Sequence, residues 1–177
     1  MARHARRKSS TGIYNVMLRG EPLFTEEGDY DAFVERMAQY FMDNAKIYAY
    51  CLTDKAACFI LKESDKGISR DMKPFVTSYA RYYNRKHETA GSVFKDRFKS
   101  EPIETKKYLL ESMAVMHNLY ELLICDAYTG DDDILNGGGV CAGREVLKLI
   151  GGRKKYISAM EGENIVLTPF YGVLKKS

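Results

Sequence analysis

The sequence predicts an α+β protein in which helices pack on an antiparallel sheet of four strands. The first observation is a set of short stretches with the apolar pattern of β-strands, at residues 12–19, in the two halves of 47–62, and at 98–103. The second is a set of longer stretches in which apolar residues recur at helical spacing, at residues 30–44, 68–87 and 106–123. Together they predict the order strand, helix, strand, strand, helix, strand, helix.

The first strand, at residues 12–19, is apolar on much of both faces, which is typical of a strand buried on both sides. Gly20 and Pro22 end it. Asp29 is the expected N-cap of the first helix, because its carboxylate can accept hydrogen bonds from backbone N–H groups that the first turn leaves unpaired. This helix is expected to cover residues 30–44 and to lay one apolar face on the sheet. The residues on that face are Tyr30, Phe33, Val34, Met37 and Phe41.

The hairpin at residues 47–62 has its turn at 53–56, and alternation places Ala56 and Cys58 on one face of its second strand. If the hairpin is symmetric, Cys51 stands opposite Cys58, where a disulfide is geometrically conceivable. In a reducing cytosol two buried thiols are the better expectation. The four cysteines, which include Cys125 and Cys141, form no Cys-x-x-Cys pair, so no zinc site is expected.

The second helix, at residues 68–87, contains Pro74, so either its first turn is distorted or the regular helix begins near Lys73. A fourth strand follows at 98–103, and Thr105 is the expected N-cap of the third helix at 106–123. Helices packed on an antiparallel sheet in this order are the ferredoxin-like or split β-α-β arrangement.

Size and composition indicate one folded domain with an appendage. The chain has 177 residues, 45% of them hydrophobic and 29% charged. The basic start is not followed by an apolar run, which excludes a signal peptide, and no stretch approaches the ~18 apolar residues of a membrane helix, so a cytoplasmic location is expected. We expect a basic arm at 1–11, the main domain at 12–126, a Gly/Asp-rich flexible linker at 127–142, and a helical segment and tail at 143–177.

Positive charge gathers in the middle of the chain although the net charge is only +3. Residues 66–107 hold eleven Lys and Arg against five Asp and Glu, a local charge of +6, and residues 1–8 add four more cations. This pattern favours an anionic partner, most plausibly nucleic acid. The alternative is a solvated helix face without a partner.

Five stretches resemble, in order and spacing, the REP-associated single-tyrosine transposases of the HUH type. They are Tyr-Asn-Val-Met-Leu-Arg-Gly at 14–20, Tyr-Ala-Tyr-Cys-Leu at 48–52, Ile-Ser-Arg at 68–70, Tyr-Ala-Arg-Tyr-Tyr-Asn-Arg-Lys-His at 79–87 and Phe-Lys-Asp-Arg-Phe-Lys-Ser at 94–100. The similarity covers roughly residues 12–123. It implies a ferredoxin-like fold, usually dimeric, that nicks single-stranded DNA beside imperfect hairpins.

The resemblance also implies a His-hydrophobe-His pair that holds Mg²⁺ or Mn²⁺ on the scissile phosphate, and a nucleophilic tyrosine on the third helix. This sequence departs from both. Ala56 and Cys58 stand where the family has its histidines, and Val115 stands where it has the tyrosine. Alanine offers no ligand, and a thiol is a poor donor for Mg²⁺ or Mn²⁺. Neither Tyr108 nor Tyr120 fits the place of the nucleophile by helical geometry.

The sequence therefore predicts a catalytically degenerate member of this family, without a metal or another cofactor, that binds single-stranded or hairpin DNA and forms a homodimer. The expected phosphate and base contacts are Arg19, Arg70, Arg81, Arg85, Lys86, Lys95, Arg97, Lys99 and Tyr82. Two alternatives are an active transposase or nuclease with an atypical site, and a non-catalytic module that binds RNA or protein.

Overall fold

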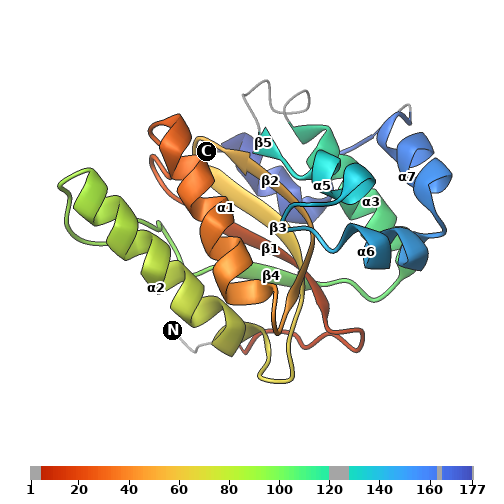
Figure 1. Cartoon of the computed structure of the whole chain (residues 1–177), viewed down its shortest axis with the longest axis horizontal. Coiled ribbons are helices and arrows are strands. Elements are labelled where there is room, and N and C mark those ends of the chain that lie inside the picture. Colours follow the sequence, from red (N-terminus) through yellow and green to blue (C-terminus); the bar gives the residue numbers. More distant parts are fainter. Residues whose placement is uncertain (1–4, 120–127, 163–164, 177) are drawn as a thin grey trace.

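The protein, in a computed structural model that describes residues 5–119, 128–162 and 165–176, is an α+β fold built on an antiparallel sheet. Figure 1 shows α2 at one end of the molecule and α6 and α7 at the other. The elements in chain order are β1 (Ile13–Arg19), α1 (Glu27–Phe41), β2 (Lys46–Thr53), β3 (Ala56–Lys62), α2 (Ile68–Lys86), β4 (Lys99–Pro102), α3 (Lys106–His117), β5 (Tyr128–Thr129), α5 (Asp131–Asn136), α6 (Gly143–Ile150), α7 (Arg153–Met160), α8 (Pro169–Gly172) and the 3-10 helix η1 (Val173–Lys176).

The sheet has five strands among the described residues, in the order β4-β1-β3-β2-β5, where the sequence predicted four. The additional strand, β5, pairs with the outer edge of β2 through Cys51 opposite Thr129 and Leu52 opposite Tyr128. Tyr128 also packs 6.3 Å from the Tyr50 ring and 6.1 Å from the Tyr30 ring. A strand of two residues is too short to show the alternation of apolar and polar residues that predicts a strand. Its pairing covers the open edge of β2.

Phenylalanines fill the layer between the sheet and the helices α1 and α2. The Phe75 ring of α2 lies 5.0 Å from Phe33 and 4.8 Å from Phe41, both on α1, and 6.1 Å from Phe59 on β3. All four rings are fully buried. Because side chains alternate along a strand, Phe59 on this side places its neighbours Cys58 and Ile60 on the opposite face.

The starts of α1 and α2 differ from the prediction. Helix α1 begins at Glu27 with Glu26 as its N-cap, so Asp29 is not the N-cap but the third helical residue. Its carboxylate accepts hydrogen bonds from the backbone N–H groups of Thr25 at 2.8 Å and Glu26 at 3.2 Å, which is the reciprocal half of a capping box. Helix α2 begins at Ile68 and keeps Pro74 inside it, so a start near Lys73 is wrong.

The segment expected to be a flexible linker, 127–142, contains β5 and α5. The Asp133 carboxylate accepts hydrogen bonds from the backbone N–H groups of Val140 at 2.9 Å and Cys141 at 3.3 Å, which fixes the glycine-rich turn after α5. A Cβ atom on Gly139 would lie 1.8 Å from Asp133 Oδ1, so this turn requires glycine there. The division of the chain into domains stays a prediction.

Helices α3, α6, α7 and α8 belong to the other side of the sheet. Helix α3 contacts β2, β3, α6 and α7, and α8 reaches β1 through a hydrogen bond from the Tyr171 hydroxyl to Asn15 Oδ1 at 2.8 Å. Helix α3 ends at His117, and residues 120–123 of its predicted range, like Cys125, lie outside the described residues. Within the described parts of the chain, no helix has the length and apolar character needed to cross a membrane.

Candidate nucleic-acid interface

Ala56 and Cys58 lie on the face of β3 that carries α3, as alternation along the hairpin predicts. Ala56 pairs with Thr53 on β2 and Arg19 on β1, and Cys58 stands between Cys51 and Met17. Ala56 and Cys58 are only 2% and 1% exposed, respectively. Strands on both sides therefore enclose the two positions at which the family resemblance places metal ligands.

Val115, the position expected to carry a nucleophile, is also buried. It lies on α3, which contacts both β2 and β3, so it shares a side of the sheet with Ala56 and Cys58. It borders a groove of about 590 Å³ that includes Leu110 of α3 and Ile165 of the tail. Val115, Ala56 and Cys58 offer no oxygen or nitrogen side-chain donor, so they do not fit Mg²⁺ or Mn²⁺.

A buried polar cluster, which the sequence did not predict, lies on this face of the sheet. Asn15 of β1 is fully buried and donates from Nδ2 to Ser112 Oγ at 3.0 Å and to the Tyr108 hydroxyl at 3.4 Å. Its Oδ1 accepts from Tyr171, and Tyr108 donates to Glu101 Oε1 at 2.9 Å. The available signal was the asparagine itself, a polar residue within a strand that is otherwise apolar on both faces.

The two tyrosines of this cluster, Tyr108 and Tyr171, have raised pKa values. Burial raises the pKa of Tyr171 well above its usual value, and the pKa of Tyr108 is raised by burial and by the Glu101 carboxylate beside it. A phenol attacks phosphate as its anion, and burial makes that anion harder to form. The hydrogen bonds of the cluster attach α3 and α8 to the sheet.

His117 pairs with a carboxylate at the end of α3. Its Nδ1 lies 2.7 Å from Asp131 Oδ2, which also accepts from the Thr129 hydroxyl at 2.8 Å, and Tyr156 of α7 donates to the same carboxylate. Burial opposes ionisation of Asp131, but these hydrogen bonds outweigh it and lower the pKa of the carboxyl. Across residues 5–119, 128–162 and 165–176, no three His, Cys, Asp or Glu side chains converge as a metal site would require.

The basic residues on α2 are partly exposed and partly held by neighbours. Arg70, Arg81 and Arg85 are exposed. Lys86 forms an ion pair with Glu26 and donates to the Tyr82 hydroxyl at 3.0 Å. That hydroxyl in turn donates to Gly28 O at 3.1 Å, and the guanidinium of Arg36 lies over the Tyr82 ring, 4.4 Å from its centroid. Tyr82 is therefore packed between the helices, whereas the expected contact was an exposed stacking platform.

The basic residues around β4 also divide into paired and unpaired cations. Arg19 pairs with Asp96 at 2.6 Å, and Lys95 lies 3.6 Å from Glu21. Arg97 and Lys99 are exposed and take part in no ion pair among the described residues. They line a groove of about 690 Å³ together with Arg6, Phe98, Glu101 and Phe170.

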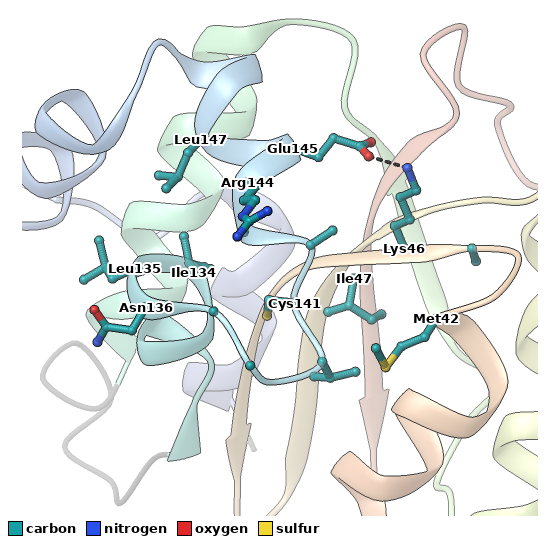
Figure 2. Close-up of a pocket in the computed structure, with 16 residues that line it drawn as sticks. Met42, Lys46, Ile47, Ile134, Leu135, Asn136, Cys141, Arg144, Glu145 and Leu147 are labelled. Atoms are coloured by element: carbon teal, nitrogen blue, oxygen red, sulfur yellow. Dashed lines mark hydrogen bonds and ion pairs between the residues drawn. The ribbon is translucent and has the colours of Figure 1, made fainter.

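Another hollow, of about 580 Å³, lies between the start of β2 and the turn from α5 to α6 (Figure 2). Its wall is mostly apolar and includes Met42, Ile47 and Leu147. Lys46 and Glu145 form an ion pair at its rim, and Tyr48 donates to Glu145 Oε1 at 2.6 Å. These contacts join α6 to the sheet edge, away from the basic residues of α2 and β4.

Comparisons with known proteins give a fold but no close relative. No protein-family model and no curated protein matches this sequence. Among solved structures, the chain is similar to a REP-associated tyrosine transposase bound to a REP hairpin, with a TM-score of 0.58 and 12% sequence identity. The alignment covers 69% of this chain and 74% of the transposase chain. The present chain therefore shares the fold of a REP-associated tyrosine transposase.

Proposed function

We propose that this protein is a transposase-like DNA-binding protein that recognises hairpin or single-stranded DNA. The observation that carries the proposal is a set of exposed cations without a carboxylate partner among the described residues: Arg70, Arg81, Arg85, Arg97 and Lys99. Unpaired Arg and Lys side chains are the groups that neutralise phosphates and release counterions when a protein binds DNA. The fold supports the proposal, because a structure with this fold was solved bound to a REP hairpin.

The first four strands support the ferredoxin-like arrangement within this proposal. Their order is β4-β1-β3-β2, and every neighbouring pair is antiparallel. Strand β5 is then an addition at the β2 edge. Arg97 precedes β4 at the opposite edge of the sheet, and Lys99 is the first residue of that strand. The β4 edge and the outer surface of α2 are the parts of the molecule that we assign to DNA.

Binding without strand cleavage is the second part of the proposal. Ala56, Cys58 and Val115 supply neither metal ligands nor a nucleophile, and the hydroxyls of Tyr108 and Tyr171 are held in hydrogen bonds with raised pKa values. The chain retains a basic surface on a transposase fold while its own residues do not reproduce the chemistry expected of the family. Its activity is then to hold DNA and not to cut it.

A binding titration tests the first part. Fluorescence anisotropy with a labelled DNA hairpin is expected to show affinity that falls roughly 500-fold between about 50 and 200 mM salt, if five cations each neutralise one phosphate of the duplex stem at a slope of about −0.9 per contact. An unstructured strand of the same length is the comparison that reveals hairpin preference. Absence of binding, or binding that does not respond to salt, contradicts the proposal.

Incubation of the protein with labelled single-stranded DNA and Mn²⁺ tests the second part. We expect no covalent protein–DNA adduct and no shortened strand on a denaturing gel. An adduct that mass spectrometry maps to Tyr108 or Tyr171 would show that the protein is an active enzyme with an atypical site. A shortened strand without an adduct would instead indicate a nuclease.

A further inference from the structure

A basic groove of about 560 Å³ lies between α1 and α2, the two helices that cover the Phe59 side of the sheet. The side chains that matter for its chemistry are Arg36 and Tyr40 of α1 and Lys73, Arg81, Tyr82 and Arg85 of α2. No carboxylate lines it, and none of its four cations takes part in an ion pair among the described residues. The groove therefore concentrates positive charge without a counter-charge from the described chain.

The cations of α2 form a row along the groove. Lys73, Arg81 and Arg85 line the same groove and are spaced by multiples of four residues, so the row turns by about 40° around α2 with each step of four, and Thr77 occupies the remaining place. From Lys73 to Arg85 the row extends for about 18 Å at 1.5 Å per residue. Like charges four residues apart, as in Arg81 and Arg85, repel each other, and an anion that lies along the row removes this repulsion.

Arg36 faces this row from α1, and its guanidinium is already fixed in place. Its Nη1 donates to the backbone oxygen of Ala32 at 2.8 Å, and the group lies over the Tyr82 ring at 4.4 Å. Its Nε is buried without a hydrogen-bond partner in the described structure. Guanidinium groups bind phosphate through their N–H donors, and a group that neighbours already hold in place loses little conformational freedom when an anion binds. The sequence does not single out Arg36, because this residue lies on α1, outside the basic segment 66–107.

We propose that this groove binds the phosphate backbone of a nucleic-acid strand, with Arg36 as a fixed contact and Lys73, Arg81 and Arg85 as a row beside it. The inference rests on the proposed DNA binding and names a place for it. A row of about 18 Å matches roughly five nucleotides of one strand of a duplex at about 3.4 Å per nucleotide, and an open groove suits an extended phosphate backbone better than a small metabolite. The groove lies on the opposite side of the sheet from Ala56 and Cys58, so a strand bound there is held away from those positions.

Matched variants test the groove by anisotropy with the DNA hairpin. The double variant R81Q/R85Q is expected to bind at least tenfold more weakly at about 50 mM salt and to lower the salt slope by about 1.8, the value for two lost contacts with the duplex stem. The control K148Q/K154Q removes the same charge from exposed positions on α6 and α7, at the other end of the molecule, and is expected to leave the salt slope unchanged.

The single variant R36K tests the fixed contact. It keeps the positive charge but loses the planar guanidinium group, and it is expected to weaken binding severalfold. Thermal midpoints within about 2 °C of the unmodified protein identify variants that are folded.

Different outcomes separate this inference from the proposed function. If the unmodified protein binds the hairpin with a salt response and R81Q/R85Q behaves like K148Q/K154Q, the groove assignment is wrong and DNA binding stands. If the unmodified protein does not bind the hairpin, calorimetry with tripolyphosphate decides whether the groove binds phosphate. If tripolyphosphate binds and both R36K and R81Q/R85Q weaken that binding, the groove is a phosphate site, but its ligand is not a nucleic acid. Absence of binding, or tighter binding of a polyglutamate peptide, overturns the site.

Discussion

Replacement of Asp29 with alanine is expected to lower the free energy of unfolding by about 3 kcal/mol, because this buried carboxylate accepts hydrogen bonds both from the chain before α1 and from the end of α2. It accepts from the backbone N–H groups of Thr25 and Glu26, and His87 Nε2 lies 2.9 Å from Oδ1. The side chain is fully buried, so the substitution leaves these donors inside the protein without their acceptor. The variant loses the Asp29 half of the capping box of α1 and the contact that joins α1 to the end of α2.

Thermal and chemical denaturation measure this loss, which corresponds to a fall of about 10 °C in the melting temperature for a domain of this size. Asp31→Ala is the matched control, because Asp31 is an exposed aspartate in the same helix with no side-chain hydrogen bond or ion pair in the described structure. It is expected to change the free energy of unfolding by less than about 0.5 kcal/mol. Equal losses in the two variants would show that Asp29 acts only through its charge near the helix N-terminus.

The contribution of Asp29 to the free energy of unfolding is expected to fall at low pH. Burial alone would raise the pKa of this carboxyl, but the hydrogen bonds from His87, Thr25 and Glu26 outweigh burial and lower the pKa. A lowered pKa in the folded state means that the stabilisation is fully present above the unfolded value of about 3.9 and is lost as the pH falls through the folded value. The difference between the unmodified protein and Asp29→Ala is therefore expected to shrink as the pH falls below about 4.

Replacement of Asn15 with alanine is the second large effect, a loss of about 3 kcal/mol in the free energy of unfolding. The substitution leaves the hydroxyls of Ser112 and Tyr171 without their buried partner. Since Tyr171 belongs to α8, the tail is also expected to become more accessible to protease. Asn44→Ala is the control, because Asn44 is exposed and its side chain has no hydrogen bond in the described structure.

A double-mutant cycle isolates the bond between Asn15 and Tyr171. Tyr171→Phe alone is expected to cost about 1–2 kcal/mol, because it leaves Asn15 Oδ1 unpaired. The two substitutions together are expected to cost about 1 kcal/mol less than the sum of the single losses, because the second one removes a group that has already lost its partner. Additive losses would mean that α8 is held by packing and not by this hydrogen bond.

The strands and helices that the sequence predicted well are those whose pattern arises within the element itself. The hairpin register follows from its short turn, so Cys51 stands opposite Cys58 as predicted, and both are buried. The aromatic stripes of α1 and α2 meet in one layer because helical spacing places each stripe on one face. The starts of α1 and α2 were less predictable, because an Asp close to a helix start serves either as N-cap or in a capping box.

The sequence predicted only part of the candidate site. Cations such as Arg81 and Arg97 appear in the sequence as local positive charge. The sequence does not show that Arg19, Lys86 and Lys95 form ion pairs with carboxylates. Arg36 is distant in the sequence from the cations beside it, and only the packing of α1 against α2 brings them together. The sequence likewise does not show that Tyr82 is occupied by contacts with Arg36 and Gly28.

The sequence by itself determined the α+β class, the hairpin that carries Ala56 and Cys58, and the concentration of basic residues in the middle of the chain. These depend on residue identity, periodicity and short-range pairing, which the chain carries locally. Only the tertiary structure decided the fifth strand, the cluster around Asn15 and the groove between α1 and α2. Each of these features joins residues that are far apart along the chain. A local sequence pattern does not predict a contact between two residues of different helices or strands.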